Sequence, residues 1–161
     1  MPTRTRPVAD AASQRAAEGL LEAWGLVQDL QLRVPGEVEE RFGIPPHRLH
    51  VLGAVRRGVT RIQDIAAAAF TSVSAASRTV DGLVKEGWLD RRADPDDRRA
   101  SCVTLTPQGE QEMQRIATWA QGMVARIVAE VGTERAGRVA DDLAVFATRL
   151  SEELDRQAEG Q

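Results

Sequence analysis

The spacing of the apolar residues changes just after Gly87, from a helical period to a strand period, and this change restricts the fold. Before that glycine, apolar residues recur every three or four positions, which is typical of amphipathic helices. Two short segments with strand character follow at 88–92 and 101–105, and the residues between them are turn formers and charges. From Thr106 onward the helical spacing returns. The sequence therefore predicts a mainly α fold with one small β-hairpin.

Prolines and glycines set the expected ends of the helices. A first amphipathic helix is expected over about 9–32 and should end at Val34-Pro35-Gly36, because proline cannot continue a helix. One or two further helical turns over 37–42 are an open alternative. The remaining helices are expected at about 46–57, 60–68, 73–86, 106–130 and 133–157.

Two of these helices follow one another almost at once. The spacing of Thr60 and Gln63 predicts a capping box that opens a helix to about residue 68. Ser72 is expected to cap the next helix, which buries Val80 and Leu83 and stops at Gly87. Two helices joined by a turn of about four residues form a helix-turn-helix pattern.

The composition fits one ordinary globular domain. The chain has 161 residues, of which 42% are hydrophobic and 28% charged, and this argues against wholesale disorder. No apolar run approaches the roughly 18 residues of a membrane-spanning helix, and the N-terminus does not resemble a secretory signal. The single cysteine, Cys102, cannot form an internal disulfide, so a reducing, cytoplasmic setting is expected.

The charge is unevenly distributed along the chain. Residues 41–99 hold ten arginines and Lys85 against seven acidic residues, a net charge of +4, within a chain whose overall charge is −3. The segments on either side, 1–40 and 100–161, are both net acidic. A basic middle between acidic ends is typical of a segment that faces nucleic acid, although chance clustering is the alternative.

Residues for catalysis or metal binding are scarce. The sequence contains no glycine-rich phosphate loop, no paired-cysteine zinc site and no nucleophile elbow. His47 and His50 lie three residues apart on one expected helix, and we expect them on the surface or lining a pocket, since no further ligand accompanies them. Cys102 is expected to be a small core residue. No enzyme activity, cofactor or metal is predicted.

Three motifs in order resemble those of the MarR (multiple antibiotic resistance regulator) family of winged-helix transcription factors. Residues 74–87 resemble the recognition-helix run of that family, Asp94-Pro95-Asp96-Asp97-Arg98-Arg99 resembles its wing, and Leu105-Thr106-Pro107-Gln108-Gly109 resembles its Leu-Thr-x-x-Gly entry into the next helix. The resemblance is dense over about 49–109. It implies one domain over 1–161, with a winged helix-turn-helix core at 46–106 flanked by long dimerisation helices at 9–42 and 107–157.

The resemblance also implies which residues bind DNA. A recognition helix presents its first turns to base edges in the major groove, and an arginine there can contact a phosphate or a guanine. In the family, an aspartate in the wing holds it and an arginine enters the minor groove, roles that fall on Asp97 and Arg99. The expected DNA-binding residues are Ser72, Ser74, Ala75, Ser77, Arg78, Asp97, Arg98 and Arg99. The alternative for the helix residues is that small polar side chains only cap and solvate the start of a helix. The alternative for the wing residues is a solvent-exposed turn held by salt bridges.

Members of the family form homodimers that place two recognition helices in successive major grooves of a pseudo-palindromic operator. Many also bind a small anionic aromatic molecule. The residues expected to line such a pocket here are Trp24, His47, His50 and Arg57, with a core position in the dimer interface as the alternative for Trp24.

The leading hypothesis is therefore a dimeric regulator, expected to be a repressor, that binds double-stranded DNA and is released by a small ligand. A winged helix that serves only as a protein-docking module is the first rival, and it predicts an exposed apolar face on the helix at 73–86. An enzyme is the second rival and lacks a catalytic constellation.

Overall fold

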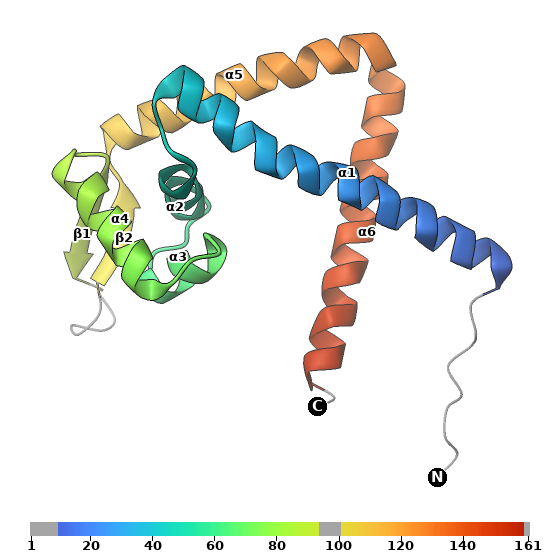
Figure 1. The fold of residues 1–161 in the computed structure, drawn as a ribbon, viewed down its shortest axis with the longest axis horizontal. Helices are drawn as coiled ribbons and strands as arrows, with labels where there is room; N and C mark the ends of the chain where they lie inside the picture. The colour runs from blue at the N-terminus through green and yellow to red at the C-terminus, as the bar shows by residue number, and fades with distance from the viewer. Residues whose placement is uncertain (1–9, 94–100, 160–161) are drawn as a thin grey trace. The chain divides into compact units, whose positions relative to one another are not determined.

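A computed structural model describes residues 10–93 and 101–159 (Figure 1). Its elements, in chain order, are α1 (Ala11–Phe42), α2 (Pro46–Arg56), α3 (Ile62–Ala68), α4 (Val73–Lys85), β1 (Leu89–Ala93), β2 (Ser101–Leu105), α5 (Pro107–Val131) and α6 (Thr133–Glu159). The fold is mainly helical with one antiparallel hairpin, as predicted. It divides into two compact units, residues 1–113 and 114–161. No helix within the described ranges is both long and apolar enough to cross a membrane.

The first helix is longer than the sequence predicted. Helix α1 continues through Pro35 and ends only at Gly43, so the predicted stop at Val34-Pro35-Gly36 is wrong and the open alternative of helical turns at 37–42 is correct. Proline removes one backbone hydrogen bond and normally bends or ends a helix. Here Pro35 is buried and Val38, three residues later, is 1% exposed, so packing of the proline and of the turn that follows it stabilises the continued helix.

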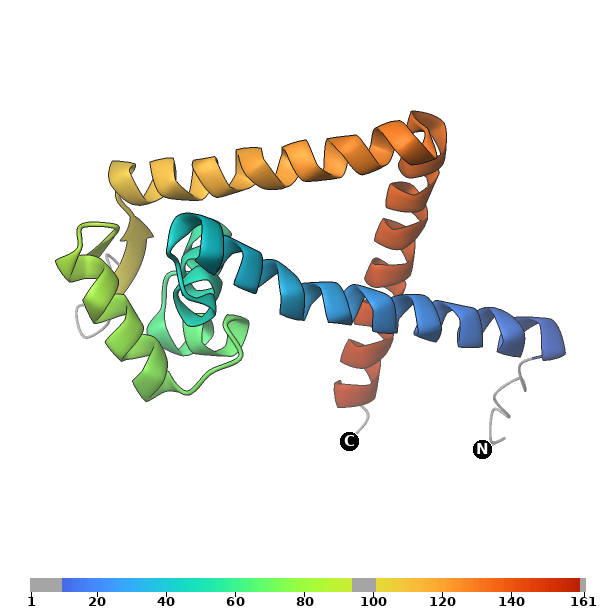
Figure 2. The same ribbon diagram turned by 45° about the horizontal axis from the view of Figure 1, so that its top comes forward.

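The core of the first unit lies among α2, α3 and α4, which contact one another and gather beside the hairpin in Figures 1 and 2. Its central side chains are fully buried: Leu52 from α2, Ile65 from α3 and Leu83 from α4 are each 0% exposed. Burying a side chain of this size contributes about 1.5–3 kcal/mol. The predicted helix-turn-helix is therefore confirmed and has a close-packed interior.

The start of α3 corrects one prediction. The N-cap of this helix is Arg61, and no side-chain hydrogen bond caps it, so the predicted capping box between Thr60 and Gln63 is wrong. The backbone oxygen of Thr60 instead accepts a hydrogen bond of 2.9 Å from the amide of Val103 in β2. Thr60 thus lies in extended chain against the hairpin, and the tertiary hydrogen bond prevails over the local capping pattern.

The hairpin pairs β1 and β2 antiparallel, with Leu89 opposite Leu105 and Arg91 opposite Val103. Leu89 and Val103 are almost fully buried, at 2% and 0% exposed, and so anchor the hairpin to the helices. Cys102, predicted to be a core residue, is only half-buried, because its side chain points to the opposite face of the strand from its neighbour Val103.

The Thr106–Gly109 segment joins the hairpin to α5. The Thr106 hydroxyl donates a hydrogen bond of 2.6 Å to the Gly87 carbonyl and accepts one of 3.1 Å from the Gly109 amide. A β-carbon at Gly109 would lie 2.1 Å from the carbonyl oxygen of Trp88. Only glycine fits this approach, which explains the Leu-Thr-x-x-Gly spacing seen in the sequence.

This close approach predicts that Gly109→Ala destabilises the protein by about 2 kcal/mol or more, because backbone atoms must move to admit the methyl group. Gly36→Ala is the matched control, since Gly36 lies within α1 and a β-carbon there would meet nothing within 4 Å. That control should stabilise the protein by about 0.5–1 kcal/mol. Denaturant unfolding of both variants measures the difference, and equal effects would contradict the steric argument.

Candidate nucleic-acid interface and ligand pocket

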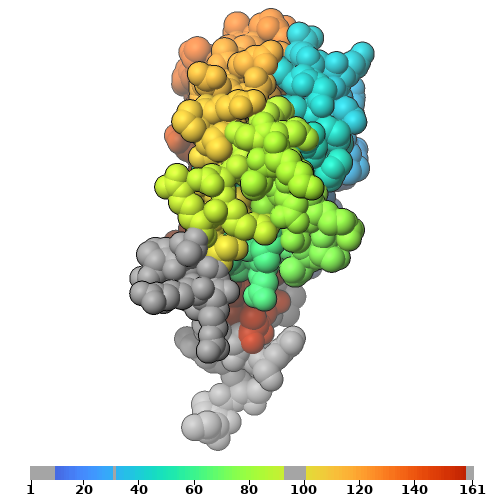
Figure 3. Space-filling view, turned by 90° about the vertical axis from the view of Figure 1, so that its left-hand side faces the viewer, coloured from blue at the N-terminus to red at the C-terminus, as the bar shows by residue number. Residues whose placement is uncertain are grey.

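Helix α4 presents one buried and one exposed face. Ala76, Val80 and Leu83 are 0% exposed and pack into the core. The opposite face carries a polar stripe at helical spacing, formed by Ser74, Arg78, Asp81 and Lys85. Figure 3 looks onto the side of the first unit on which α4, in yellow-green, lies uncovered. The apolar side chains of α4 therefore anchor the helix to the core, and its polar side chains face the solvent.

The start of α4 is ordered by Ser72. Its hydroxyl caps the helix by accepting a hydrogen bond of 3.2 Å from the Ala75 amide, and it lies 3.2 Å from the hydroxyl of Ser74. Among the predicted DNA-binding residues, Ser72, Ser74 and Arg78 are exposed, whereas Ala75 and Ser77 are half-buried. The structure thus brings these five residues together over the first two turns of one helix.

Arg78 is an exposed cation on the polar stripe of α4. Within the part of the chain that the structure describes, no ion pair to Arg78 is found, whereas Arg91 and Arg48 both have carboxylate partners. The neighbouring Thr79 hydroxyl donates back to the Ala75 carbonyl at 3.0 Å. An unpaired arginine on an exposed helix face can bind a phosphate or a base edge without first breaking another contact.

Two ion pairs that the sequence analysis did not predict position α4. Asp81 lies 3.1 Å from Arg91 of β1 and joins the helix to the hairpin. Glu86, the C-cap of α4, pairs with Arg48 of α2, whose guanidinium also lies 5.4 Å from the centre of the Trp88 ring. These residues are distant in sequence, and no local spacing signals their pairing.

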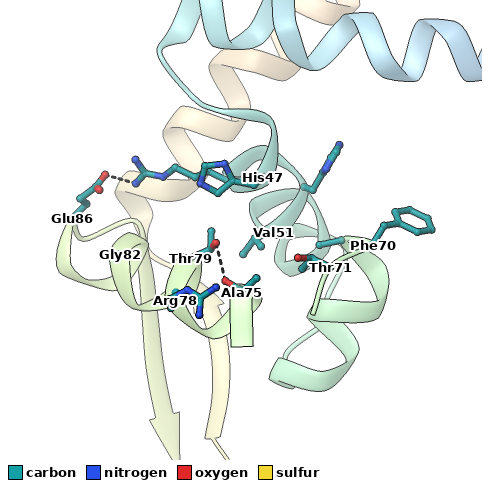
Figure 4. A pocket seen from close by; sticks show the side chains of 12 residues that line it. His47, Val51, Phe70, Thr71, Ala75, Arg78, Thr79, Gly82 and Glu86 are labelled. Carbon is teal, nitrogen blue, oxygen red and sulfur yellow. Dashed lines mark hydrogen bonds and ion pairs between the residues drawn. The ribbon is translucent and has the colours of Figure 1, made fainter. Parts of the chain in front are cut away.

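A cavity of about 620 Å³ opens between α2, the α3–α4 turn and α4 (Figure 4). His47 and His50 line it from α2, Phe70 and Thr71 from the turn, and Arg78 and Thr79 from α4. The two histidines were predicted to line a pocket, and the structure places them there together. Arg48 and Glu86, which pair with each other, also line it, so Arg78 is the lining cation that can attract a small anionic aromatic molecule beside the imidazoles and the apolar walls.

The other residues predicted for the pocket do not line this cavity. Trp24 lies on α1 and is 38% exposed. Arg57 follows α2 at its C-terminal end and is also exposed. The predicted wing residues Asp97, Arg98 and Arg99 lie outside the described residues. No group of three metal-ligating side chains occurs in the described ranges.

The long helices expose many apolar side chains. In α1 of the first unit, the exposed ones are Leu20, Leu21, Trp24, Leu26, Val27, Leu30 and Leu32. In the second unit they are Val124, Ile127 and Val131 of α5 and Val139, Leu143, Val145, Leu150 and Leu154 of α6. Soluble monomers rarely expose apolar surface on this scale.

Comparisons with known proteins agree with this geometry. The MarR family model matches residues 42–100, whereas no curated protein matches the chain. The solved structures that are similar to it include a MarR family transcriptional regulator from Silicibacter pomeroyi DSS, at 19% identity and a TM-score of 0.63, covering 90% of this chain and 95% of that one.

Two more solved structures are similar over most of the chain. MarR from E. coli is 21% identical with a TM-score of 0.58, covering 83% of this chain and 95% of its own. A variant of S. aureus MepR bound to an oligodeoxyribonucleotide is 17% identical with a TM-score of 0.56, covering 81% and 97%. These findings agree with the resemblance read from the motifs: the MarR family model matches residues 42–100, and the chain has the fold of the MarR family transcriptional regulators.

Proposed function

We propose that this protein is a homodimeric, sequence-specific DNA-binding regulator, acting as a repressor in the cytoplasm and released from its operator by a small ligand. The observation that carries the proposal is the polar stripe of α4, with Arg78 unpaired among the described residues and the helix anchored by a fully buried apolar face. This is what a helix needs in order to enter a major groove while remaining fixed to its domain.

Support for DNA binding comes from the chemistry of the helix start. Ser72 and Ser74 offer hydroxyls to phosphates or bases, and Arg78 offers the bidentate geometry that guanine accepts. The similar fold of the MepR variant was solved with an oligodeoxyribonucleotide bound. The rival hypothesis, a protein-docking module, predicts an apolar stripe where Ser74, Arg78, Asp81 and Lys85 lie. The stripe therefore favours DNA over protein.

Support for a homodimer comes from the exposed apolar faces of α1, α5 and α6. A second copy of the chain offers the same faces, and a two-fold interface between identical patches covers both at once. Two copies also supply two recognition helices, which matches the two half-sites of a pseudo-palindromic operator.

Support for release by a ligand comes from the position of the cavity. Arg78 is one of its lining residues and is also the cation of the exposed stripe. A small aromatic carboxylate that draws Arg78 into the cavity would withdraw it from DNA. A cavity with this lining suits the binding of a ligand, and we propose a binding function for it.

The first prediction for this function concerns the arginines. Arg78→Ala and Arg99→Ala should each cost about 1–3 kcal/mol of specific binding, because each removes a contact from both half-sites. The slope of log K against log salt for the wild type should be roughly −4 to −7, as expected for up to about eight neutralised phosphates.

Arg135→Ala is the charge-matched control, since Arg135 lies exposed on α6, and it should bind like the wild type. Titrations on operator and scrambled duplexes at several salt concentrations measure these effects. Equal affinity for both duplexes would reject sequence-specific binding and favour the docking module.

The second prediction concerns assembly. Sedimentation at micromolar concentration should show a dimer, and Leu143→Glu should yield monomer or aggregate, because Leu143 is 47% exposed on the apolar face of α6 and a buried, unpaired carboxylate is costly. Asp142→Ala, at the neighbouring exposed position, is the control and should remain dimeric. A well-folded wild-type monomer would contradict the proposal.

The third prediction concerns the cavity. A panel of small aromatic carboxylates should include at least one that displaces the protein from DNA, and His50→Ala should reduce this displacement because His50 lines the cavity. Arg57→Ala should retain it, since Arg57 lies outside that lining. Displacement lost in Arg57→Ala but kept in His50→Ala would place the ligand elsewhere.

A further inference from the structure

Phe70, in the turn between α3 and α4, has an unusual backbone conformation. Its φ is 52°, and it is the one non-glycine residue with positive φ among those that the structure describes. The turn is closed by hydrogen bonds from the Phe70 amide to the Ala67 carbonyl at 3.1 Å and from the Thr71 amide to the Ala66 carbonyl at 2.9 Å. Such a position after a helix normally carries glycine, because a β-carbon is disfavoured in the left-handed region.

Packing of the Phe70 side chain within the protein does not offset the cost of this backbone conformation. It is 95% exposed, more than any other large apolar side chain in the described ranges, and its ring extends outward from the rim of the cavity (Figure 4). Both the backbone conformation and the solvation of the ring therefore favour glycine over phenylalanine. Local strain combined with an exposed aromatic ring indicates that the residue contacts something outside the chain.

The position of Phe70 indicates what it contacts. Phe70 lies two residues before Ser72, the N-cap of α4, and Val73, on the other side of that cap, is 48% exposed. Arg78 lines the same cavity as Phe70. The ring is thus part of the surface that would meet the major groove, at the end of α4 whose side chains contact base edges.

We infer that Phe70 packs its ring against the C5-methyl group of a thymine at the edge of the major groove and so contributes to sequence preference. The inference rests on the proposed DNA binding. The thymine methyl is the apolar group that the major-groove edges of the bases present, and phenylalanine is a side chain that contacts it. Val73 extends the apolar surface on the far side of Ser72. Burial of both ring and methyl repays the cost of the left-handed turn.

The test begins by selecting a preferred duplex from a random pool with the wild-type protein. Failure to enrich any sequence would reject the proposed function itself and is distinguishable from every outcome below. Uracil then replaces thymine one position at a time in the selected duplex, which removes only the methyl group. At the contacted position the wild type should lose roughly fourfold in affinity for each methyl group, the effect expected for one buried methyl group.

The decisive variant is Phe70→Gly. It should raise the melting temperature by about 2–4 °C, because glycine accepts the positive φ without strain, yet it should bind the thymine duplex more weakly and no longer distinguish thymine from uracil at that position. Phe70→Leu is the matched control, since it keeps both an apolar side chain and the unfavourable φ. It should retain a preference for thymine without the gain in melting temperature.

Three results would overturn the inference. The first is that Phe70→Gly binds the selected duplex as tightly as the wild type, which would assign the ring to another partner or to none. The second is that the wild type shows no sensitivity to uracil at any position. The third is that Phe70→Gly keeps the full sensitivity of the wild type, which would assign the methyl contact to another residue such as Val73.

Discussion

The placement of the hairpin beside α4 depends on the hydroxyl group of Thr106. This one side chain contacts the Gly87 carbonyl, just after the C-cap of α4, and the Gly109 amide in the first turn of α5. Backbone polar groups at helix ends otherwise need water or a capping side chain. Because a single hydroxyl satisfies groups at two helix ends, the end of α4, the start of the hairpin and the entry into α5 form one rigid junction.

Two ion pairs near this junction connect α4 to its neighbours but contribute little to the free energy of unfolding. The pair between Asp81 and Arg91 joins side chains that are 50% and 36% exposed, and such pairs contribute about 0–1 kcal/mol. The pair joins the C-terminal half of α4 to β1. Arg48 joins the C-cap of the same helix to α2 through Glu86, and its guanidinium lies over the Trp88 ring.

Local sequence signals predicted most of the elements, because helix ends, the N-cap at Ser72 and the strand alternation are encoded over a few residues. Prediction failed where tertiary contacts prevailed over local rules. Burial of Pro35 and Val38 carries α1 through a proline, and the hydrogen bond from Val103 removes Thr60 from its expected cap.

The candidate site was predicted in part for the same reason. The exposed start of α4 and the placement of His47 and His50 follow from helical spacing, which fixes the face on which a residue lies. Arg48 and Arg91 were missed, since their partners come from other elements. Trp24 and Arg57 were assigned to the pocket by resemblance alone, and their positions on α1 and after α2 leave them out of the cavity lining.

The double placement of Arg78, on the exposed stripe and in the cavity lining, has a thermodynamic consequence. If one guanidinium serves both sites, a molecule held in the cavity and a DNA helix compete for it. Coupling between two binding sites is reciprocal, so DNA weakens the binding of that molecule by the same factor as the molecule weakens the binding of DNA. Protein already on its operator would then respond only at a higher ligand concentration than free protein, and the abundance of operator sites would help to set the threshold of the response.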